Sequence, residues 1–102
     1  MNVGQAIKAK FSEDAIGEMA GEMLFEGQDA LEVVAACEEL GVIIIGMDFW
    51  QQRGGNIVEI NSTDYSSINA LPDAPKKTIE AARELLKNGL PDNADYVSFI
   101  LQ

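Results

Sequence analysis

The chain has 102 residues, 47% of them apolar, and its 17 acidic and 7 basic residues give a net charge of −10. This length fits a single domain over residues 1–102 with one hydrophobic core, and the apolar content excludes a disordered chain. Such a charge disfavours nucleic acid and anionic membranes as partners, so a basic protein is the natural complement.

Neither a targeting segment nor a membrane span is expected. No apolar run of signal-peptide length follows Lys8 and Lys10, and the longest aliphatic run, residues 42–45, is too short to cross a bilayer. We therefore expect a cytoplasmic protein. Cys37 is the one cysteine and lies in an apolar stretch, which indicates a packed thiol.

The first part of the chain predicts a helix over residues 12–26. Residues 1–11 before it are a short helix or an arm. Apolar residues recur at helical spacing between 15 and 24, after a potential N-cap and two acids that favour a helix N-terminus. Gly17 and Gly21 each weaken such a helix by on the order of 1 kcal/mol relative to Ala. The helix would therefore depend on docking.

A second helix and a central strand are predicted next. Asp29 can cap a helix over residues 29–40, and Gly41 is placed to be its C′ residue. Residues 42–47 are apolar on both alternating faces, which is typical of a central, fully buried strand.

A hairpin is predicted after this strand. Residues 51–56 have turn chemistry, and residues 57–61 alternate as an edge strand that pairs antiparallel with the first. Alternation places Glu59 and Asn61 on the side opposite to Val58 and Ile60. Residues 62–72 form a long polar loop, and loops of that length are often functional.

The remainder predicts a helix, a turn and a last strand. Asp73 and Pro75 signal the start of the helix, and Gly89 closes it. A turn follows at 91–95, and residues 96–101 alternate as a strand. The expected fold is therefore α/β (α+β), with helices packed on one face of a small three-stranded mixed sheet in the order ααββαβ.

Charge is unevenly distributed along the chain. Residues 12–51 contain no Lys or Arg but ten acids, whereas the other residues hold seven acids and seven bases. On a helix over 12–26, four of these acids would line one edge at intervals of four residues, where like charges repel by roughly 0.2–0.5 kcal/mol per pair. This edge is either a solvated surface or a partner-binding surface; its residues are Asp14, Glu18, Glu22 and Glu26.

Two acid–aromatic pairs are further candidates for partner binding. Alternation puts Asp48 on the same side of the central strand as Trp50, where they could anchor a partner's Lys or Arg. Alternatively, Trp50 covers the edge of the core and Asp48 caps a loop. Asp64 and Tyr65 in the polar loop repeat the pairing, and they would lie near Asp48 if the loop folds back.

The residue types give little support for catalysis. Without histidine the chain has no Ser-His-Asp or Cys-His arrangement and no imidazole metal ligand. No Asp-x-Asp-x-Asp-Gly loop is present for a divalent cation, and residues 53–56 lack the spacing of a phosphate loop. We therefore expect no enzyme activity, no cofactor and no metal site.

The order of elements resembles a family of bacterial immunity proteins that accompany polymorphic or contact-dependent growth-inhibition toxins. The resemblance covers roughly residues 12–101, and its most distinctive motif is Gly-x-Asp followed by aromatic residues, at 46–50. An aromatic loop with Tyr65 and an Ala-rich helix at 79–82 follow it. The resemblance implies stoichiometric inhibition of a cognate toxin, often a nuclease with a basic cleft.

The sequence thus predicts an immunity protein that binds a cognate basic toxin domain through an acidic surface, as a monomer or weak homodimer. The alternative is a small acidic regulatory or adaptor subunit, which could be a homodimer joined through the edge strand at 57–60. A carboxylate-based enzyme is the third and least supported hypothesis.

Overall fold

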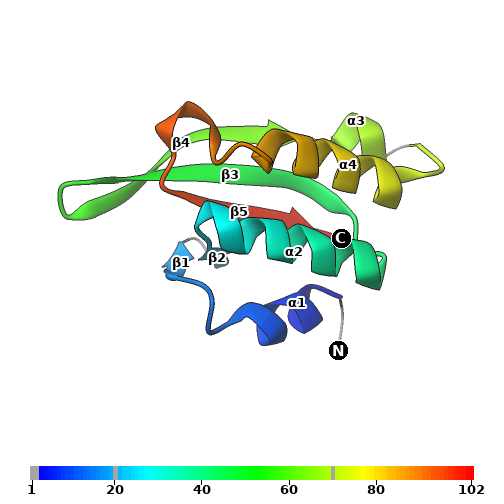
Figure 1. Cartoon of the computed structure of the whole chain (residues 1–102), viewed down its shortest axis with the longest axis horizontal. Coiled ribbons are helices and arrows are strands. Elements are labelled where there is room, and N and C mark those ends of the chain that lie inside the picture. Colours follow the sequence, from blue (N-terminus) through cyan, green and yellow to red (C-terminus); the bar gives the residue numbers. More distant parts are fainter. Residues whose placement is uncertain (1–2, 20, 70) are drawn as a thin grey trace.

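The computed structural model describes residues 3–19, 21–69 and 71–102. It belongs to the α+β class, with a two-stranded sheet, β1-β2, and a three-stranded sheet in the order β4-β3-β5 (Figure 1). The elements in chain order are α1 (Val3–Phe11), β1 (Gly17–Met19), β2 (Glu22–Leu24), α2 (Gly27–Leu40), β3 (Ile44–Arg53), β4 (Asn56–Asp64), α3 (Ser66–Asn69), α4 (Ala74–Leu86), a 3-10 turn (Pro91–Asn93) and β5 (Tyr96–Leu101).

The larger sheet is antiparallel throughout, so the predicted mixed sheet was wrong. β4 returns along β3 through a hairpin, and β5 returns antiparallel to β3 after α4. α2 and α4 lie side by side against one face of this sheet, and none of the described helices covers the other face (Figure 1). The order ααββαβ was also wrong, because a strand pair replaces one predicted helix and α3 precedes α4.

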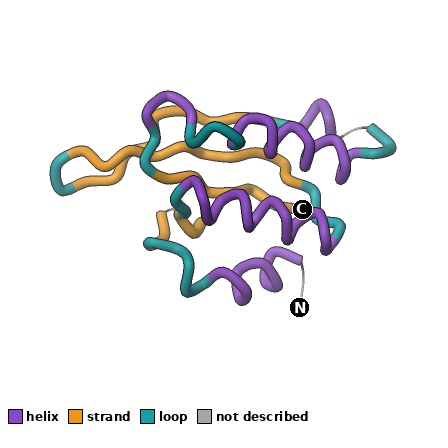
Figure 2. The backbone as a smooth tube through the Cα atoms, viewed as in Figure 1, coloured by secondary structure: helices purple, strands orange, loops and turns teal. Residues whose placement is uncertain are grey.

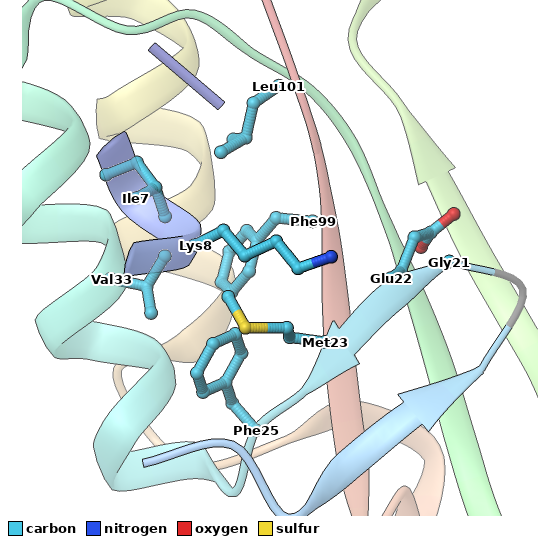
Figure 3. A pocket seen from close by; sticks show the side chains of 9 residues that line it. All are labelled: Ile7, Lys8, Gly21, Glu22, Met23, Phe25, Val33, Phe99 and Leu101. Carbon is cyan, nitrogen blue, oxygen red and sulfur yellow. The ribbon is translucent and has the colours of Figure 1, made fainter. Parts of the chain in front are cut away.

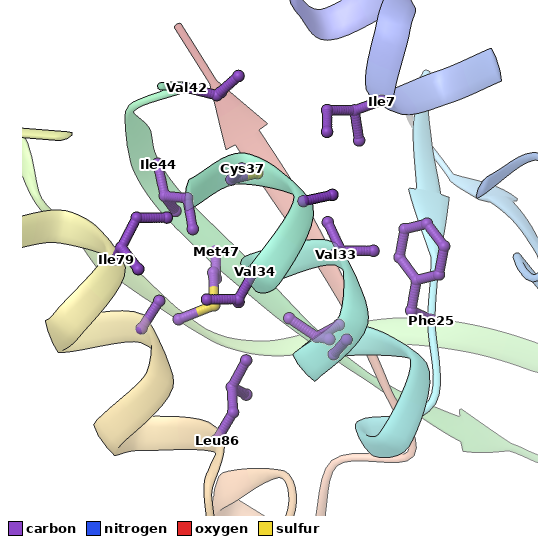
Figure 4. Close-up of a cluster of buried hydrophobic side chains, with 14 of the residues drawn as sticks. Ile7, Phe25, Val33, Val34, Cys37, Val42, Ile44, Met47, Ile79 and Leu86 are labelled. Atoms are coloured by element: carbon purple, nitrogen blue, oxygen red, sulfur yellow. The ribbon is translucent and has the colours of Figure 1, made fainter. Parts of the chain in front are cut away.

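The hydrophobic core lies between the sheet and these two helices (Figure 4). Ile7 and Phe11 extend it beneath α1, where the Phe11 ring meets the Phe25 ring edge-on at a centroid distance of 6.1 Å. Cys37 is fully buried, as predicted, and burial raises the pKa of its thiol to about 12. The central members of the core are Phe25, Val33, Val34, Cys37, Ile44, Met47, Phe49, Ile79, Leu86 and Val97.

The predicted helix over residues 12–26 was wrong. Helix α1 ends at Phe11, and β1 and β2 form a short antiparallel hairpin in which Gly21 adopts a φ of 81°. That left-handed conformation suits glycine and would interrupt a helix. A bridge between Phe25 and Val97 ties the hairpin to β5 and buries Phe25, which offsets any helical preference of this segment.

The other predicted elements occur with shifted ends. α2 begins at Gly27, so Asp29 lies in its first turn rather than at the N-cap; Gly41, with a φ of 70°, caps its C-terminus as predicted. β5 spans Tyr96–Leu101 as predicted. The predicted loop over 62–72 contributes its first residues to β4 and contains α3.

A β-bulge shapes the pairing of β4 with β3. The register shifts between Phe49 and Trp50, so Trp50 pairs with Glu59 while Phe49 pairs with Asn61. Glu59 and Asn61 therefore lie on opposite faces of the sheet, which corrects the prediction that they share one. Beyond the bulge the β3-β4 hairpin extends past the helices as a two-stranded arm (Figure 2).

No helix in the described ranges combines the length and apolar character that crossing a membrane requires.

Candidate functional site

Carboxylates gather on the sheet face that has no helix. Along β3, side chains alternate, so Asp48 shares this open face with Gly46 and Trp50. In β4, Glu59 pairs with Trp50 and Asp64 pairs with Gly46, which places both acids on the same face. Three acids from two neighbouring strands thus project from one surface.

The β1-β2 hairpin adds a fourth acid. Ser98, on β5 opposite Asp48, donates a 2.5 Å hydrogen bond from its buried hydroxyl to Glu22 Oε1. Trp50 Nε1 in turn donates to Ser98 Oγ at 2.9 Å. Glu22 leaves β2 toward this side of β5, away from the side chains of α1 and α2 (Figure 3).

The acids of this face repel one another. Burial raises the pKa of Glu22, the hydrogen bond from Ser98 opposes that shift, and the nearby charges of Asp48 and Glu59 add to it. The pKa of Glu59 is also raised, by desolvation and then by the charge of Asp48. Asp48 is thus close to both glutamates, and its negative charge disfavours their ionised forms.

We call the surface formed by Glu22, Asp48, Glu59 and Asp64 the acidic face. Among the described residues of β3, β4 and β5 whose side chains point to this side, none is Lys or Arg. Arg53 lies on the opposite side of the hairpin arm, where its Nε donates to Gln51 Oε1 at 2.7 Å. The remaining bases lie on α1, on α4 and directly after α4; they are Lys8, Lys10, Lys76, Lys77, Arg83 and Lys87.

Four of the eight predicted partner-binding residues come together on this face: Glu22, Asp48, Trp50 and Asp64. Asp64 ends β4, and its carboxylate accepts a 2.8 Å hydrogen bond from the Ser66 amide, which lowers its pKa. Trp50 is 7% exposed, and its indole N–H donates a hydrogen bond to the Ser98 hydroxyl. Trp50 therefore positions the site instead of offering an exposed anchor.

The other four predicted residues lie elsewhere. The proposed edge of four acids does not exist, because residues 12–26 are not a helix. Asp14 lies in the turn after α1, Glu26 precedes α2, and Glu18 on β1 pairs with Lys8 at 3.1 Å. Tyr65 is half-buried and packs against the core.

Two residues of the site were not predicted. Alternation predicted that the Glu59 side chain points to the polar side of its strand. Its position beside Trp50 could not be predicted, because it depends on the register shift at the bulge. Ser98 breaks an apolar run at an alternating position of β5, a weak signal for a polar contact on the open face. Both assignments require knowledge of which strands are neighbours.

Within the part of the chain that the structure describes, no three or more Asp, Glu, Cys or His side chains are grouped so that they could hold a metal ion. Comparison with known proteins found no matching family model, no matching curated protein and no matching solved structure.

The raised pKa of Glu22 predicts a pH-dependent stability. A carboxyl group whose pKa is higher in the folded than in the unfolded chain contributes stability at a pH below its unfolded-state pKa, which is 4.5 for glutamate. That contribution is lost as the pH rises through the folded-state pKa. Glu22→Gln keeps an acceptor for Ser98 and can donate to Asp48. We expect this variant to be more stable at pH 7.5 by about 0.2–1 kcal/mol, as measured by urea unfolding.

The control is Glu18→Gln, on the other strand of the same hairpin. Its partner is the exposed Lys8, so this change should leave the decline in stability as pH rises above 4.5 unaltered. A Glu22→Gln variant with the wild-type pH dependence would contradict the proposed repulsion.

Proposed function

We propose that this protein is an immunity protein that binds and neutralises a cognate bacterial toxin, with the acidic face as the contact surface. The observation that carries the proposal is the gathering of Glu22, Asp48, Glu59 and Asp64 on a face without Lys or Arg in its described positions. Complementary charge accelerates encounter with a basic partner and favours it over acidic competitors.

The energetics of the acidic face support a binding role. Desolvation and repulsion by the charge of Asp48 raise the pKa of Glu22 and of Glu59, so keeping these glutamates ionised costs free energy in the free protein. Such local conflicts are expected where function requires them. A guanidinium or ammonium group from a partner would relieve this repulsion between Glu22, Asp48 and Glu59. Because the repulsion is relieved on binding, a cation gains more from contact with this group of carboxylates than from contact with the same carboxylates in isolation.

The face also offers apolar surface beside the charge. Ile100 is 40% exposed and Tyr96 is partly exposed, and both point to the same side as Asp48. Apolar contacts ringed by charged groups are typical of protein interfaces. We therefore propose a basic toxin domain as the partner, a nuclease with a basic cleft among the candidates.

The alternative, an adaptor subunit that dimerises through β4, has one structural argument in its favour and two against it. β4 is a nine-residue strand at the end of its sheet. However, it carries a bulge, and the Ser62 amide donates to the side chain of Asn61 at 2.8 Å, features that protect an edge from pairing. Two chains of net charge −10 would also repel. Sedimentation separates the proposals, since a tight dimer at micromolar concentration favours the adaptor.

Co-expression tests the proposed function. The neighbouring upstream reading frame is expressed in bacteria with and without this protein, and growth is followed. We expect the neighbour to be toxic alone and harmless in the presence of this chain. A neighbour that is not toxic, or whose toxicity is unchanged, would contradict the proposal.

A further inference from the structure

A second site lies on the helix side of β5, away from the acidic face. A pocket of about 190 Å³ opens between α1, β2 and β5 (Figure 3). Its apolar walls come from four different elements and include side chains that remain partly exposed, such as Met23 and Phe99. The apolar lining residues are Ile7, Met23, Phe25, Val33, Phe99 and Leu101.

Two charged residues, Lys8 and Glu22, lie at the mouth of the pocket, and they point in different directions. Lys8 extends across the opening with its aliphatic stem over the apolar side chains and its ammonium group beyond them, whereas the carboxylate of Glu22 points away toward Ser98 (Figure 3). Lys8 Nζ contacts Glu18 Oε1 at 3.1 Å, and both side chains are more than half exposed. An ammonium group has three donors, so this contact leaves capacity for a second acceptor.

Size and chemistry together restrict the occupant. An apolar cavity of about 150 Å³ accommodates benzene, so this pocket has room for one ring or a chain of about six carbons. A ligand that uses both the apolar walls and Lys8 must combine a short hydrocarbon part with an anionic head.

We propose that this pocket binds a small apolar monocarboxylate, with its hydrocarbon part between Met23, Phe25 and Phe99 and its carboxylate on Lys8. This site does not depend on the proposed toxin binding, because it uses the opposite side of β5. For a ligand of about eight non-hydrogen atoms we expect a dissociation constant on the order of 1 mM.

Titration with matched six-carbon probes tests the proposal. Hexanoate, hexanol and hexylammonium are each added to the methyl-labelled protein, and NMR shifts of Ile7, Met23 and Leu101 are followed. We expect saturable shifts at these residues and at least a fivefold preference for hexanoate over hexylammonium. Lys8→Met should remove that preference while hexanol still binds, and Lys10→Met, on the same helix, should preserve it.

Three results would overturn the site. They are the lack of saturable shifts at Ile7, Met23 and Leu101 with any probe, equal or tighter binding of hexylammonium, and a hexanoate preference that survives Lys8→Met. Lys8 is exposed, so its replacement should leave the fold intact. The hexanol titration of the variant verifies this, because the apolar walls must still be present for hexanol to bind.

Discussion

Asp48→Lys is expected to abolish neutralisation of the partner toxin without destabilising this protein. Asp48 lies between Glu22 and Glu59, and a lysine there would place a cation at the centre of the acidic face. Loss of a hydrogen-bonded charge pair at an interface costs about 2–5 kcal/mol. Affinity should therefore fall by about 30-fold to 4,000-fold, since about 1.4 kcal/mol corresponds to a factor of ten.

The stability of the variant separates this effect from misfolding. The introduced ammonium group would be attracted to the two glutamates that repel Asp48, so urea unfolding should show a stability equal to or above that of the wild type. Glu39→Lys is the matched control, because it makes the same charge change at an exposed position on α2. Equal loss of binding in both variants would indicate that only net charge matters and would contradict a contact at the acidic face.

Gly46→Ala is expected to lower the free energy of unfolding by about 1–3 kcal/mol, the usual cost of forcing atoms into a packed site. A Cβ at residue 46 would lie 2.6 Å from the carbonyl oxygen of Thr63, which belongs to the backbone of β4. The two strands must separate locally to admit it. In a domain of this size the melting temperature should fall by roughly 4–8 °C for each kcal/mol.

Gly55→Ala provides the comparison for this substitution. No atom lies within 4 Å of a Cβ built at Gly55, which sits in the hairpin turn outside the left-handed region. Its change in stability should stay within about 0.5 kcal/mol. Thermal unfolding of both variants checks the expectation, and a Gly46→Ala protein as stable as Gly55→Ala would show that β4 does not approach β3 as described.

Elements with one consistent pattern could be predicted from the sequence. β5 follows from the apolar residues Val97, Phe99 and Leu101 at alternating positions, and the end of α2 follows from Gly41 after a helical stretch. The β1-β2 hairpin could not be predicted, because apolar residues at 15, 16, 19, 20, 23 and 24 fit a helix equally well. The pairing of Phe25 with Val97, distant in sequence, decides between the two structures.

The candidate site likewise has one part that could be predicted from local sequence patterns and another that could not. Alternation alone places Asp48 beside Trp50 on one strand face, and the structure agrees. Glu22 reaches this face only because the hairpin docks on β5, and Glu59 only because the bulge shifts the register of β4. Proximity that depends on neighbouring strands cannot be deduced from local spacing.

The most direct test of the acidic face as a binding surface is to map the contact in solution. The isotope-labelled protein is titrated with the purified product of the neighbouring reading frame, and backbone amide shifts are recorded. We expect shifts concentrated in residues 46–52, 57–64 and 96–100, with α4 unaffected. Shifts confined to α2 and α4, or no complex at all, would contradict the account.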